Sequence, residues 1–248
     1  LRTFPGDTCD ASTDITCGAG IVQIAASTPT AFTCQPVLYQ SAVASGSYLF
    51  KYTLQGTSGF SFERIGDSNG GLNGLGYNTA DDYIYGNNGS GKLIRLGANG
   101  VVEVLANQPA ASLTNNSGDF WGPDILISAP GTTNNWKKVD LSDPTNPVSS
   151  NFTLTGGVTY RGSDIAILGN TAYAIHDNGS VLFIVDLLQQ TIRTKSITGL
   201  NARIGLGFGA AFADAQGNLF FHNNSGYVWR IWASDLTQDP VPVEKVGE

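Results

Sequence analysis

Three stretches of seven residues, far apart in the chain, are nearly the same. They read IYGNNGS at 84–90, AIHDNGS at 174–180 and FFHNNSG at 220–226. A short apolar strand pattern precedes each, and two further patterns of this kind centre near Leu38 and Leu126. The steps between the five patterns are about 45 residues. A fixed period of this length is the signature of a repeat architecture, so we interpret the chain as five copies of one unit.

Each unit contains four short strand patterns joined by turns rich in Gly, Asn, Asp and Ser. The first pattern of a unit is made of small residues, as in GFGAAFAD at 207–214, and suits an innermost position where blades converge. In the first unit, GIVQIAA at 20–26 takes this place. Four strands in about 45 residues are typical of a β-propeller blade.

The sequence therefore predicts an all-β, five-bladed propeller with four-stranded blades. Residues 1–35 form a cysteine-containing segment packed on the propeller or completing it, and residues 36–248 form the repeats. Six blades are the alternative, if residues 1–35 and the C-terminus combine. A β-sandwich or an ordinary barrel is the next choice.

The repeated corners lie between the second and third strands of each blade. Sequences such as NNG, DNG and NNS readily adopt the positive φ that tight hairpin turns require. We interpret them mainly as turn chemistry, with a ligand pocket repeated in each blade as the alternative.

The low charge of the chain narrows the choice of partners. Only 13% of residues are charged, about half the usual ~25%, and the formal net charge is −7. Nucleic-acid binding requires a positive field, so we exclude this partner. No apolar run reaches the length of a membrane-spanning helix, and we expect a monomer.

Several features favour a secreted glycoprotein, at the cell surface or in the wall. The sequence begins with Leu rather than Met, which suggests a removed signal peptide. Five Asn-x-Ser/Thr sequons are candidate glycosylation sites: Asn88, Asn115, Asn151, Asn178 and Asn223.

The three cysteines, Cys9, Cys17 and Cys34, all lie near the N-terminus. In an oxidising compartment two of them would form a disulfide and one would remain, and the sequence leaves the pairing open. A zinc site is disfavoured because it needs four ligands and no histidine is nearby.

Three segments together resemble a family of secreted fungal and bacterial propeller-like domains of unknown function. They are GFGAAFADAQGNLFFHNNSGYVWRI at 207–231, LNGLGYNTADDYIYG at 72–86 and SGDF at 117–120. The resemblance covers roughly residues 45–235 and implies an extracellular protein. It brings no catalytic residues.

Two sets of polar residues fall where propellers often bind ligands. Asn73, Asp119 and Asp164 are expected at the start of innermost strands, facing the central channel. They could hold Ca²⁺ or Mg²⁺, which prefer oxygen ligands, or the two carboxylates could act on a glycosidic bond. The structural alternative is that they cap the channel and bind water.

The other candidates are aromatic. The only histidines, His176 and His222, are expected at equivalent positions of two blades, each beside a corner. Trp121, close to Asp119, could stack on a sugar ring. Trp229 and Trp232 are three residues apart, so one is expected in the core and the other at the surface.

The residues leave three functions open. A binding module for glycans or a cell-surface ligand is favoured by the repeat, the low charge and the absence of a recognised catalytic motif. The alternatives are a glycoside hydrolase or lyase at the channel mouth, and a structural or adhesive wall protein. We therefore expect binding rather than catalysis.

Overall fold

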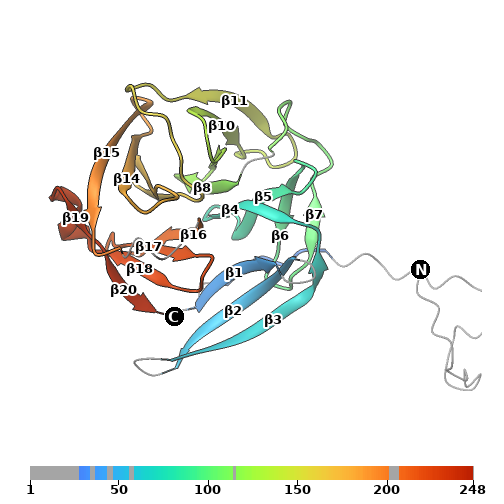
Figure 1. Ribbon diagram of the computed structural model, residues 1–248. Coiled ribbons are helices and arrows are strands. Elements are labelled where there is room, and N and C mark those ends of the chain that lie inside the picture. The colour runs from blue at the N-terminus through green and yellow to red at the C-terminus, as the bar shows by residue number, and fades with distance from the viewer. Residues whose placement is uncertain are drawn as a thin grey trace, which may run out of the picture.

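Five small antiparallel sheets are arranged in a ring, which makes the protein a five-bladed β-propeller, as the repeat predicts (Figure 1). The structure is a computed structural model and describes residues 28–33, 37–43, 47–55, 59–113, 116–200 and 207–247. The three cysteines, Asn115 and the segment 20–26 lie outside these residues.

The blades follow one another in chain order. Blade 1 contains β1 (Val37–Val43), β2 (Ser47–Gln55) and β3 (Gly59–Asn69). Blade 2 contains β4 (Leu72–Asn78), β5 (Tyr83–Asn88), β6 (Leu93–Leu96) and β7 (Val102–Val104). Blade 3 contains β8 (Ser117–Trp121), β9 (Ile125–Ala129), β10 (Asn135–Asp140) and β11 (Val148–Thr153).

The last two blades share the C-terminal part of the chain. Blade 4 contains β12 (Ala166–Leu168), β13 (Thr171–Ile175), β14 (Val181–Asp186) and β15 (Thr191–Thr198). Blade 5 contains β16 (Phe208–Ala213), β17 (Leu219–Asn223) and β18 (Val228–Ile231). After a 3₁₀ turn (Ala233–Thr237), β19 (Val241–Pro242) pairs in parallel with β15, and β20 (Glu244–Gly247) completes blade 5 beside β18. The C-terminus thus ties blades 4 and 5 together.

The small-residue strands occupy the innermost positions, as expected, and Figure 1 shows β4, β8 and β16 near the middle of the ring. Glycine is required where β4 and β8 approach each other. A Cβ on Gly76 would lie 2.9 Å from the Asp119 Cα, and one on Gly118 would overlap the backbone carbonyl of Gly74. No larger residue fits this approach without moving a blade.

Among the described residues, the core consists of four apolar clusters, each between two neighbouring blades. One, centred on Leu49 and Ile94, joins blades 1 and 2, and another, centred on Tyr85 and Phe120, joins blades 2 and 3. The other two join blades 3 and 4 and blades 4 and 5. Trp229 is 3% exposed and Trp232 is 42% exposed, which confirms the opposite orientations predicted for them.

The ring closes differently between blades 5 and 1. Among the described residues, no buried apolar cluster joins these two blades. Instead, the Nε2 of Gln40 on β1 lies 2.9 Å from the Nδ1 of His222 on β17. The seam is therefore joined by a polar contact.

Candidate functional site

The repeated corners are hairpin turns held by asparagine side chains. Asn88 Oδ1 accepts the backbone N–H groups of Ser90 and Lys92, at 3.0 and 2.9 Å. Asn223 Oδ1 accepts those of Ser225 and Tyr227, at 3.1 and 2.9 Å. Because these oxygens satisfy the turn itself, the corner asparagines serve chain reversal rather than a repeated ligand pocket.

His176 occupies in blade 4 the place that asparagine occupies in blades 2 and 5. Its Nδ1 accepts the N–H of Asn178 at 3.0 Å, and its carbonyl accepts the N–H of Gly179 at 2.7 Å. The carbonyls of Asn88 and Asn223 accept the corresponding N–H groups of their own turns. The structural equivalent of His176 is therefore Asn223.

The predicted equivalence of His176 and His222 is wrong by one residue. His222 pairs with Val228 inside the ladder of blade 5, before the turn begins. The ring of His222 lies at the seam with blade 1. Burial lowers the pKa of His222, against the effect of a hydrogen bond between the ring and the backbone carbonyl of Gly226. The two histidines correspond in the sequence alignment of the repeats, but the hydrogen-bond register of the strands decides which positions are structurally equivalent.

The asparagines of the predicted glycosylation sites differ in their exposure to solvent. Asn178 and Asn151 are exposed, and Asn88 is half-buried. Asn223 is 2% exposed, and its Nδ2, the atom to which a glycan would be attached, has no accessible surface. The folded protein therefore has no room for a glycan at Asn223, whereas Asn88, Asn151 and Asn178 remain candidates and Asn115 lies outside the described residues.

Asp119, on the innermost strand of blade 3, uses both carboxylate oxygens to bind backbone. Oδ1 accepts the N–H of Phe120 at 2.8 Å, and Oδ2 accepts the N–H of Ile167, in blade 4, at 2.7 Å. Burial raises the pKa of Asp119 to about 7, against the effect of these two hydrogen bonds. This side chain links two blades.

Asp164 repeats the arrangement one blade further on, immediately before β12. Its carboxylate accepts the N–H of Ile165, at 2.9 Å, and those of Ala211 and Gly118 from the neighbouring blades. Burial raises the pKa of Asp164 well above its usual range, and the charge of Asp119 raises it further. With their oxygens engaged by backbone donors, the two carboxyls are better suited to joining blades than to attacking a substrate.

The remaining channel candidates do not join the carboxyls in one site. Trp121 donates from Nε1 to Asn170 Oδ1 at 2.9 Å and packs against the apolar cluster between blades 3 and 4. Asn73 is exposed, and its Oδ1 accepts the N–H of Gly74 at 3.1 Å. The contact of Trp121 joins two blades, and that of Asn73 is local to its own strand.

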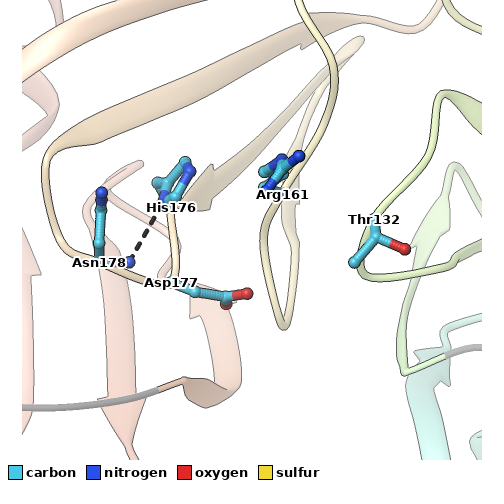
Figure 2. Close-up of a pocket in the computed structure, with 5 residues that line it drawn as sticks. All are labelled: Thr132, Arg161, His176, Asp177 and Asn178. Atoms are coloured by element: carbon cyan, nitrogen blue, oxygen red, sulfur yellow. Dashed lines mark hydrogen bonds between the residues drawn. The ribbon is translucent and has the colours of Figure 1, made fainter.

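A pocket of about 270 Å³ opens between blades 3 and 4 (Figure 2). Thr132 comes from the loop between β9 and β10, and Arg161 from the segment before β12. His176, Asp177 and Asn178 come from the corner between β13 and β14. Figure 2 shows the five side chains around the opening, with the hydrogen bond from Asn178 to the His176 ring.

The pocket offers mainly hydrogen-bond donors. The His176 Nδ1 accepts a backbone N–H, so the neutral ring carries its proton on Nε2 and can donate there. Asn178 Oδ1 accepts from Ser180, which leaves its amide nitrogen to face outward. Asp177 Oδ1 accepts from Ser163 Oγ at 2.5 Å, so its second oxygen is the acceptor that remains.

Sequence reasoning found only part of this pocket. It selected His176 as a ligand-binding residue and Asn178 as a sequon, and it missed Thr132, Arg161 and Asp177. A usable signal was present at Arg161, which is one of only 13 basic residues and lies in the segment that leads into an innermost strand. Thr132 carries no such signal.

The part of the chain that the structure describes shows neither a metal cluster nor a membrane-spanning helix. No group of three or more His, Cys, Asp or Glu side chains there is arranged to hold a metal ion. No helix in the same part of the chain is long and apolar enough to cross a membrane.

Comparison with known proteins supports the fold. A family model described as a repeat of unknown function (DUF6923) matches residues 38–243. No curated protein matches the chain.

Solved structures share the architecture at low sequence identity. A chain in the crystal structure of a nidogen/laminin complex is 13% identical, with a TM-score of 0.54, over 86% of this chain and 76% of that chain. A structural genomics protein of unknown function from Bacteroides thetaiotaomicron is 12% identical, with a TM-score of 0.56. That match covers 82% of this chain and 57% of the other, somewhat over half its length.

Proposed function

We propose that this chain, which belongs to the family of repeats of unknown function (DUF6923), is a secreted recognition module that binds a unit of a glycan. The site is the pocket between blades 3 and 4. The observation that carries the proposal is the gathering of five polar side chains from two blades around one opening.

The size of the pocket favours a small polar unit. Small-molecule sites usually enclose ~300–1,000 Å³. The pocket, at about 270 Å³, lies just below this range and is suited to one or two sugar units rather than to a larger ligand.

The chemistry of the lining also favours a sugar. The His176 ring and the Asn178 amide supply donors, the Thr132 hydroxyl can donate or accept, and Asp177 supplies an acceptor. Neighbouring sugar hydroxyls both donate and accept, so they can satisfy such a mixed set. The Asn178 sequon lies at the rim of the same pocket, so a glycan attached there would compete with a bound ligand.

The test is a glycan array probed with protein that carries no N-glycans. We expect selective binding to a subset of glycans. Thr132→Trp should weaken this binding roughly tenfold or more, equivalent to ~1.4 kcal/mol, because the indole fills the pocket from an exposed loop position. Loss of binding in EDTA would assign a Ca²⁺ or Mg²⁺ ion to the interaction.

Thr79→Trp is the matched control. Thr79 is also exposed but lies in the turn between β4 and β5, at the opposite end of the strands from the loop of Thr132. Its replacement should leave binding unchanged. A blank array, or full binding by Thr132→Trp, would contradict the proposal and favour a structural or adhesive role or a hydrolase.

A further inference from the structure

Arg161 is a basic residue that lines the pocket. Its side chain is exposed, and its guanidinium forms no ion pair or hydrogen bond with any residue that the structure describes. Arg95 and Arg230, by contrast, each pair with a glutamate, at 2.7 and 2.9 Å. An unpaired guanidinium at the mouth of a pocket is available to a ligand.

The neighbouring acid, Asp177, forms no ion pair with Arg161. Asp177 is joined to it only through backbone, since the Asp177 N–H donates to the Arg161 carbonyl at 3.2 Å. The carboxylate of Asp177 is engaged instead by Ser163. A hydrogen bond from a neutral hydroxyl does not cancel the charge of the Asp177 carboxylate, so an acidic ligand would gain only by contacting the Arg161 guanidinium directly.

From this arrangement we infer that the pocket selects an acidic sugar over its neutral counterpart. The carboxylate of a uronic acid unit would bind the Arg161 guanidinium, whose planar fork matches a carboxylate in two parallel hydrogen bonds. The His176 Nε2–H can donate to the same carboxylate or to the ring, and a sugar hydroxyl can donate to Asp177. This inference rests on the proposed function, because it names the class of sugar bound at that site.

The net charge of −7 acts against an anion at long range, so the preference has to arise at short range. At physiological ionic strength the Debye length is ~8 Å, and distant carboxylates are largely screened. Direct contact with Arg161 is screened much less. Titrations at this ionic strength therefore report on the pocket rather than on the charge of the whole protein.

The experiment is an NMR titration with two matched pairs of methyl glycosides: glucoside and glucuronide, galactoside and galacturonide. We expect at least one acidic member to bind the wild-type protein roughly ten-fold or more tightly than its neutral partner. Arg161→Gln should remove this preference while leaving weak binding of the neutral sugar. Arg193→Gln, an equal change of charge at an exposed position on β15, should retain it.

The outcomes separate the inference from the proposed function. If acidic and neutral members bind wild type equally, the acidic preference is wrong and the glycan site stands. An equal loss of preference in Arg161→Gln and Arg193→Gln would assign it to net charge and overturn the role of Arg161. If no sugar of either pair binds and the glycan array is also blank, both proposals are wrong.

Discussion

Replacing Gly118 with alanine is expected to destabilise the propeller by about 3 kcal/mol or more. The added Cβ would overlap the backbone carbonyl of Gly74, where β8 approaches β4 next to the channel. Backbone cannot move aside as a flexible side chain can, so a whole blade would have to shift. The Gly118 N–H also donates to Asp164, and a shift of β8 would break this link.

Urea unfolding followed by tryptophan fluorescence measures this effect. Gly70→Ala is the control, because a Cβ at Gly70 would meet nothing within 4 Å. It should change the free energy of unfolding by less than ~0.5 kcal/mol. Equal stability of Gly118→Ala and wild type would contradict the close packing of the innermost strands.

The second large effect expected is a fall in stability as the pH rises from about 4 to about 7. The pKa of Asp119 is raised from 3.8 to about 7 in the folded protein, and that of Asp164 is also raised. In this window the folded state binds more protons than the unfolded state. The stabilisation is therefore complete below about pH 4 and is lost as the pH rises through the folded pKa.

The size of the effect follows from the shift of Asp119, about three units, which corresponds to on the order of 4 kcal/mol. Carboxyls with lowered pKa values, such as Asp140 and Glu244, act in the opposite sense at lower pH. We therefore expect maximal stability near pH 4–5 and a marked decrease by pH 7.5.

Urea unfolding at a series of pH values tests this effect. Asp119→Asn should make the decrease between pH 5 and 7.5 clearly shallower, because the amide cannot ionise, while Asp164 still contributes to what remains of the slope. Asp140→Asn, which alters a carboxyl whose pKa is lowered, should leave the slope in this range as it is. If the stability of the wild-type protein stays level from pH 5 to 7.5, the pKa values of Asp119 and Asp164 are not raised in the folded protein, and the prediction is wrong.

Most of the fold could be predicted because the sequence repeats one structural unit five times. Five spaced strand patterns gave the number of blades, and the small residues around Gly118 identified the innermost strands. The corners between second and third strands were also located correctly, because turn residues such as those at Asn88 have strong local preferences.

The site could be predicted only in part, because it depends on contacts between blades. Asp119 and Asp164 appeared free to act on a ligand, and only the structure showed their bonds to Ile167 and Ala211. Thr132 and Arg161 belong to different blades, and nothing local in the sequence brings them together. The predicted equivalence of His176 and His222 was wrong because residue identity alone does not determine the register of a hairpin.

The most direct test of the glycan site uses the two histidines, which are the only ones in the chain. His176 lines the pocket, and His222 lies at the seam between blades 5 and 1 and serves as an internal control. During an NMR titration with a glycan that binds on the array, the ring signals of His176 should shift and saturate while those of His222 stay constant. Saturating glycan that leaves His176 unchanged, or that shifts His222 instead, would contradict the site.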